Sequence, residues 1–359
     1  MDHEFSRQRF VTGAMAASCA ATQPGAVLGQ VASQARKTLD IHVHLLGIGD
    51  NGSSCRLVQE ASEGSRFEYL SGRLRLRERA TTIDEGYVLA LAEQIEKSGL
   101  DKAVVLAQDA VYDDGGQADW GKTPFYVPND YLFDVVSRYP RWMIPCISIN
   151  PQRADAIPEL ERCVAKGAKI LKIHPPIQGV DLADAKRYAP FFRRCADLQV
   201  IVMVHTGHEH TAPIFDIELA NPKRLVVALD QGCTVIACHC GTGWQTDHPD
   251  MLPDFLEMLR QHKNLWGDTS VLGSAGRVRD FQRLLADHEA SERLLHGSDF
   301  PFPASPLAFA DILGAKQAAL LQTIENSLEQ DLALKVALKI GRTSAERAYR
   351  LICGEEGQP

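Results

Sequence analysis

The chain has 359 residues, of which 45% are hydrophobic and 23% are charged, so it can form one large α/β barrel or two average domains. Its formal net charge is −8 and no basic cluster is interleaved with aromatic residues, which argues against nucleic acid as a partner. No apolar run is long enough to cross a bilayer, so we expect no transmembrane segment.

The N-terminal residues 6–29 place arginines before a weakly apolar run of small residues, a layout typical of a secretory signal. The stretch also resembles a twin-arginine signal, although Gln8 stands where the second arginine is expected. A simple extension of a cytoplasmic protein explains it equally well. We therefore treat residues 1–34 as an N-terminal extension or export signal and assign residues 35–359 to one domain. Cytoplasmic and periplasmic locations both stay open.

The first predicted strand, residues 39–47 (LDIHVHLLG), carries two histidines one residue apart. Because side chains alternate along a strand, Asp40, His42 and His44 are expected on one inward face, with Asp40 deepest. Two inward imidazoles suit a metal ion, but core histidines bonded to backbone groups fit the stretch equally well. The rest of the chain has to decide between these alternatives.

Residues 47–82 are polar and show no sustained period, which predicts a long loop of the kind that forms a lid or binding element. Its arginines suit an anionic substrate if they face the site, although a solvated surface is the simpler explanation. From residue 83 onward, helices and short apolar strands alternate. The predicted helices are 83–100, 128–138, 157–166, 187–198, 222–231, 252–261 and 278–288. The strands after the first are 102–107, 143–148, 168–174, 200–205, 234–239, 264–269 and 293–298.

Eight short strands separated by helices, with no hairpin signal, indicate parallel βα units. Their nearly continuous apolar character indicates strands buried on both faces. The count of eight favours a closed (β/α)8 TIM barrel, an α/β fold, over an open doubly wound sheet. No GxGxxG follows the first strand, so dinucleotide binding has no support. The tail from residue 305 to residue 354 is predicted to add helices outside the barrel.

Polar side chains gather at the carboxyl ends of the predicted strands. They are His42, His44, Lys172, His174, His205, His239, Asp268 and Asp299. Five of the twelve histidines of the chain lie at such ends, and these ends meet at one mouth of a barrel. Because imidazoles and carboxylates are costly to bury together without a cation, we predict a divalent metal. Its predicted ligands are His42, His44, His205 and Asp299, a set typical of catalytic zinc, although manganese or another transition metal also fits.

The nine cysteines form no CxxC pair, so we expect reduced thiols and not disulfides. The sequence Cys238-His239-Cys240 has the look of a metal cluster. On a strand, however, both cysteines face away from the histidine, which favours buried apolar thiols.

Four motifs in barrel order, HVH, VHTG, CHCGTG and GSDFPFP, are similar to those of the amidohydrolase-related (amidohydrolase 2) family of metal-dependent barrels. The resemblance covers residues 39–303. It implies that His42, His44, His205 and Asp299 are metal ligands and that His239 acts as an acid/base or electrophile. The family includes hydrolases of C–N, ester and lactone bonds, and also decarboxylases and hydratases.

Lys172 and His174 share one face of their strand. Some amidohydrolases bridge two metals with a carboxylated lysine on this strand, and Lys172 could have that role. We favour an ammonium that pairs with a substrate carboxylate. His174 is predicted to face the substrate or to support a ligand, although a strand-end residue fixed by its own backbone is the plainer alternative.

The resemblance favours a hydrolase that directs a metal-activated water at a C–N, ester or lactone bond of a small molecule. Asp299 would move the proton and His239 would stabilise the developing oxyanion. A decarboxylase or hydratase using the same residues is the alternative, and a non-catalytic metal-binding barrel is a third. The sequence leaves the oligomeric state open, a homo-oligomer included.

Overall fold

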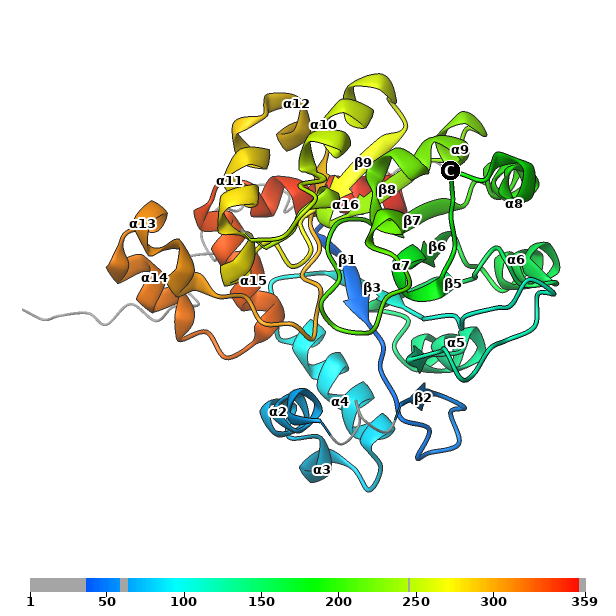
Figure 1. Ribbon diagram of the computed structural model, residues 1–359. Coiled ribbons are helices and arrows are strands. Elements are labelled where there is room, and N and C mark those ends of the chain that lie inside the picture. Colours follow the sequence, from blue (N-terminus) through cyan, green and yellow to red (C-terminus); the bar gives the residue numbers. More distant parts are fainter. Residues whose placement is uncertain (1–36, 59–63, 245, 355–359) are drawn as a thin grey trace, which may run out of the picture. The chain divides into compact units, whose positions relative to one another are not determined.

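A single sheet of eight parallel strands forms the centre of the computed structural model, which describes residues 37–58, 64–244 and 246–354 (Figure 1). The strands, in their order around the sheet, are β1 (Leu39–His44), β3 (Lys102–Leu106), β5 (Met143–Ser148), β6 (Ile170–Ile173), β7 (Ile201–His205), β8 (Val235–Cys238), β9 (Leu265–Asp268) and β10 (Leu294–Leu295). Backbone bonds from Ile41 N to His296 O and from His44 N to Phe300 O join the first strand to the segment directly after the last. The predicted (β/α)8 barrel is confirmed.

Both faces of the strands are buried. Leu39, Val104 and Ile236 pack inside the barrel, whereas Ala103, Val202 and Val235 pack outside it against the helices. This double burial explains the continuous apolar runs of the sequence.

Apart from the four-residue helix Pro175–Gln178, which was not predicted, the helices between the strands lie close to their predicted positions. They are α4 (Ile83–Glu96), α5 (Asn129–Arg138), α6 (Ala156–Ala165), α7 (Pro175–Gln178), α8 (Ala185–Asp197), α9 (Val226–Asp230), α10 (Leu252–Gln261), α11 (Val278–Ala286) and α12 (His288–Glu292). The single helix predicted over 278–288 is divided at Asp287, whose side chain accepts a hydrogen bond from Ala290 N and so begins a new helix.

The prediction of a loop over residues 47–82 is wrong in part. The segment contains a short strand, β2 (Arg56–Leu57), and two helices, α2 (Ser65–Leu74) and α3 (Leu76–Arg79), which Figure 1 shows beside α4. Few of their side chains are buried, so the apolar period that identifies a helix is missing. Strand β2 pairs antiparallel with β4 (Phe125–Tyr126) of the segment after β3.

Close contact between α3 and α4 depends on Gly86. A Cβ added at this position would lie 2.4 Å from the carbonyl oxygen of Leu76, which is too close for any other residue without a backbone shift. The buried Leu76 packs in the same core as residues of α4.

The C-terminal tail forms further helices, as predicted. They are α13 (Ala310–Leu313), α14 (Ala315–Gln322), α15 (Ser327–Ala337) and α16 (Gly341–Cys353). Ala348 and Ile352 of α16 pack with Leu39 and the other interior side chains, so this helix covers the amino-terminal end of the barrel. Among the described residues, none of the helices combines the length and apolar character needed to cross a bilayer. The predicted N-terminal extension, 1–34, lies outside the described residues.

Candidate metal centre

Strand β1 is irregular where it supplies its two histidines. Its pairing register with β3 shifts between Asp40 and Val43, and Ile41 lies inside the barrel whereas Val43 lies outside it. A β-bulge of this kind turns His42 and His44 inward directly after the inward Ile41.

The bulge overturns the prediction that Asp40 shares the face of His42. Asp40 Oδ1 accepts backbone hydrogen bonds from His42 N (2.9 Å) and Ser298 N (3.0 Å), and Asp331 of α15 lies close enough to raise its pKa. Asp40 is therefore in the barrel wall, where it joins β1 to the segment before Asp299. Burial is the largest cause of its pKa rising to about 7.

His42 is held in one tautomer by Asp268, at the end of β9. Nδ1 of His42 lies 2.8 Å from Asp268 Oδ2, and both side chains are fully buried. Burial lowers the pKa of His42 to about 3, so the ring is neutral. Because Nδ1–H donates to the carboxylate, the lone pair is on Nε2, the nitrogen that binds a metal in such carboxylate–histidine pairs.

Asp299 lies between the two histidines of β1. Its Oδ1 is 3.2 Å from Nε2 of His42 and 3.2 Å from Nε2 of His44, and its backbone N–H donates to His42 O (2.9 Å). Burial alone would raise the pKa of Asp299, but His42 and His44 hold it well below its ordinary value, so the carboxylate is ionised. Asp299 has a φ of +69°, a left-handed conformation that is uncommon outside glycine and asparagine.

His239 joins this group from the end of β8. Its ring centroid is 5.1 Å from that of His42, and the ligand atoms of His42, His239 and Asp299 all lie within 4.8 Å of one another. Ser270 Oγ donates to Asp268 and lies 2.8 Å from His239 Nδ1, so Nδ1–H must donate to the serine. Nε2 of His239 therefore also carries a lone pair.

His205 lies beside His239 and His174. Its ring is 4.8 Å from that of His239 and stacks on His174 at 4.2 Å. Glu209 approaches both rings, at 2.9 Å from His174 Nε2 and 3.8 Å from His205 Nδ1. Nε2 of His205 is buried and has no hydrogen-bond partner, as expected for a nitrogen that a metal ion would bind.

Lys172 lies deep beside the centre and not at its rim. Its side chain is 1% exposed, and Nζ is 3.3 Å from His42 Nε2 and 3.1 Å from Cys238 Sγ. Burial alone would lower its pKa, but Cys238, Asp268 and Asp299 raise it, so the lysine is charged. Its pairing with a substrate carboxylate stays a prediction.

Cys238 differs from its predicted orientation. Strand β8 ends at this residue and His239 has a φ of +62°, so the alternation on which the prediction depended stops there. The thiol of Cys238 faces the barrel interior and lies within 4.8 Å of ligand atoms of His42 and Asp268. Among the described residues every cysteine is a free thiol, as predicted. All of them are buried except Cys353, which is exposed.

These residues fit a divalent ion. Ligand atoms of His42, His239 and Asp299 lie within 4.8 Å of one another, and Nε2 of His44 is 3.2 Å from Asp299 Oδ1. The predicted ligand His205 groups instead with His174 and Glu209. Carboxylate or hydroxyl groups orient the rings of His42 and His239. Nitrogen and oxygen donors of this kind suit zinc or manganese. Asp268, Ser270 and Glu209 had no predicted role. Only Asp268 carried a usable signal, because it ends a predicted strand.

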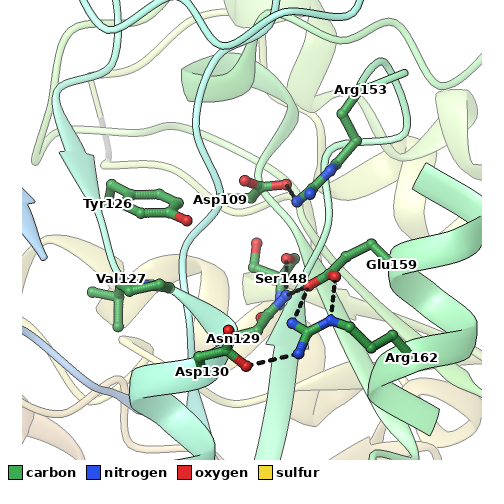
Figure 2. Close-up of a pocket in the computed structure, with 10 residues that line it drawn as sticks. Asp109, Tyr126, Val127, Asn129, Asp130, Ser148, Arg153, Glu159 and Arg162 are labelled. Carbon is green, nitrogen blue, oxygen red and sulfur yellow. Dashed lines mark hydrogen bonds and ion pairs between the residues drawn. The ribbon is translucent and has the colours of Figure 1, made fainter. Parts of the chain in front are cut away.

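A separate cavity of about 350 Å³ lies between the starts of α5 and α6 and the segment after β3 (Figure 2). Its charged groups are already paired, Arg153 with Asp109, and Arg162 with Glu159 and Asp130. None of the predicted site residues lines it. The cavity is therefore distinct from the candidate metal centre.

A sequence model of the family described as amidohydrolase matches residues 39–351. Among solved structures, an uncharacterised TIM-barrel protein from Bordetella bronchiseptica matches with a TM-score of 0.55 and 17% identity, covering 87% of this chain and 98% of that one. A probable 2-pyrone-4,6-dicarboxylic acid hydrolase from Acinetobacter baumannii, solved with citric acid bound, gives 0.54 and 14%, covering 89% and 100%. At such identities these two structures support the fold alone. No curated protein matches the chain.

Proposed function

This chain belongs to the amidohydrolase family, and from that premise we propose that it is a metal-dependent hydrolase acting on a C–N, ester or lactone bond of a small molecule. The observation that carries the proposal is the position of Asp299 Oδ1, 3.2 Å from Nε2 of both His42 and His44. We choose hydrolysis over other reactions because it is the broader activity of the family.

The proposed ligands of the metal are His42, His44, His205 and Asp299. When bound, a divalent ion supplies Lewis-acid polarisation of the scissile group and activates water near neutral pH. Zinc is our first choice and manganese the second, because both accept imidazole and carboxylate ligands.

Asp299 is the proposed proton carrier. Its Oδ1 faces the two imidazoles of β1, which leaves Oδ2 to accept the proton of the attacking water and to return it to the leaving group. The neighbouring imidazoles favour its ionised form, as a base requires.

His239 is the proposed second acid/base group. Because its Nδ1–H donates to Ser270, Nε2 can accept the proton of the attacking water in place of Asp299. The imidazolium that results can then donate to the oxygen on which negative charge develops. Burial lowers the pKa of His239 and keeps the ring neutral before the reaction.

Decarboxylation is the alternative, since Asp299 or His239 in its protonated form could donate a proton to the substrate carbon that loses CO₂. To decide, the protein is expressed with added zinc or manganese, and its bound metal is measured by elemental analysis. Lactones, aryl esters and amides are then tested for acid release, and aromatic carboxylates for CO₂ release. Metal-dependent acid release is the expected result.

CO₂ release without acid release would replace the hydrolase proposal with the decarboxylase. Less than about half an equivalent of bound metal, with no activity on adding zinc or manganese, would leave a non-catalytic barrel as the remaining explanation.

A further inference from the structure

Arg277, the last residue of the short 3-10 helix η5 (Ala275–Arg277) after β9, is a buried cation that forms no ion pair within 4 Å among the described residues. The side chain is 3% exposed. Nη1 donates to Thr242 Oγ1 (2.8 Å) and Nη2 to the backbone oxygen of His208 (2.9 Å), but Nε is buried with no partner. Its bonded acceptors are thus neutral, and one of its three nitrogens has no partner.

The guanidinium lies close to the acid/base histidine. Thr242 Oγ1, which accepts from Arg277, donates in turn to the backbone oxygen of His239 (2.7 Å). The charge of Arg277 also acts on Asp299 and His205. Arg277 is therefore at the mouth of the barrel, above the proposed catalytic groups.

A buried guanidinium with no ion pair in contact is costly, because more distant carboxylates replace its lost hydration only in part, and burial lowers the pKa of Arg277 despite them. The planar fork of arginine binds a carboxylate through two parallel hydrogen bonds, and a ligand anion would supply the missing partner. We propose that Arg277 binds a carboxylate group of the substrate that is separate from the bond that reacts. The substrate is then a small carboxylic acid. This inference rests on the proposed function in one point: it assumes that the substrate binds at the same mouth of the barrel.

Arg277 differs in this respect from Lys172. The ammonium of Lys172 contacts His42 and Cys238, and three ionisable groups of the protein stabilise its charge. Arg277 contacts only a hydroxyl and a carbonyl. The carboxylates of Asp247, Asp299, Glu209 and Asp280 favour its charge without contacting it, and burial still lowers its pKa. It also joins the loops after β7 and β8, so a purely structural role in holding these loops is the rival explanation.

The test measures binding and needs no turnover. Zinc-loaded protein is titrated by calorimetry with dicarboxylates and their monoamides, namely succinate with succinamate and terephthalate with 4-carbamoylbenzoate. Each pair has the same size and differs by one charge. We expect wild-type protein to bind at least one dicarboxylate about tenfold or more tighter than its monoamide.

Arg277→Gln should abolish this preference, and Arg277→Lys should retain part of it because the charge remains. Arg347→Gln is the matched control: Arg347 likewise bonds only to neutral oxygens, Ser291 O and Leu294 O, but at the amino-terminal end of the barrel. It should keep the wild-type preference. Melting temperature and bound zinc of each variant report any loss of structure.

A preference that survives in Arg277→Gln, or no preference in wild-type protein for either pair, overturns the proposal and leaves the structural role. Arg277-dependent binding without hydrolysis of any substrate would instead refute the proposed function and support the carboxylate site.

Discussion

Oδ2 of Asp268 lies 2.8 Å from Nδ1 of His42, and neither side chain is exposed to solvent. The other oxygen of the same carboxylate accepts from the backbone N–H groups of His239 (2.9 Å) and Ser270 (3.1 Å). One carboxylate therefore orients both a proposed ligand and the proposed acid/base residue.

Asp268→Asn should weaken zinc binding by about 10- to 100-fold, because the amide no longer fixes the tautomer of His42 as a carboxylate does. Competition with a chromophoric chelator measures the change. Asp109→Asn is the matched control, since Asp109 is also buried but pairs with Arg153, away from the centre. Unchanged zinc affinity in Asp268→Asn would contradict the orienting role.

Asp299→Asn should abolish turnover, because both a ligand and the proton carrier are lost. The effect is measured as kcat on the best substrate of the screen, together with the zinc content of the variant. Activity equal to wild type would show that Asp299 is not the proton carrier.

His239→Asn should keep most of the bound zinc and lower kcat by about 10²-fold or more, as for other general acid/base groups. Bound zinc and kcat are measured separately, because only kcat is expected to fall. Loss of zinc in this variant would move His239 into the ligand set.

Removal of the metal by a chelator should abolish activity and lower the melting temperature. An ion held at a hundred times its dissociation constant stabilises a protein by about 2.7 kcal/mol. Added zinc or manganese should restore both properties. Full activity after verified metal removal would contradict the metal-dependent mechanism.

Gly86→Ala should lower the free energy of unfolding by about 1–3 kcal/mol, because its Cβ would overlap the backbone of α3. The control is Gly72→Ala in α2, where nothing lies within 4 Å of the added Cβ. That substitution should stabilise the protein by about 0.5–1 kcal/mol, since alanine favours a helix. Denaturant unfolding measures both, and equal effects would disprove the close-contact argument.

Much of the fold could be predicted because each strand is buried on both faces and so forms a clear apolar run. The convergence of His42, His44, His239 and Asp299 could be predicted as well, since the carboxyl ends of parallel barrel strands meet at one mouth.

Other features depend on contacts that leave no local pattern. LDIHVH alternates perfectly in sequence, so the bulge that separates Asp40 from the face of His42 is invisible there. Helix α2 buries only Ser71 and Leu74, which is too few for a helical period. Arg277 ends a short 3-10 helix after β9, and only its burial without an ion pair in contact identifies it.

The seam of the barrel has a consequence for assembly. The chain closes this seam by bringing β1 to the segment after β10, across more than two hundred residues, through bonds such as Asp299 N to His42 O and Ser298 N to Asp40 Oδ1. His42 and His44 lie on one side of the seam and Asp299 on the other. Such long-range closure costs loop-closure entropy before any contact at the seam repays it. Joining the first strand to the last and bringing these three side chains together are therefore the same event, and an ion bound there would hold the barrel shut.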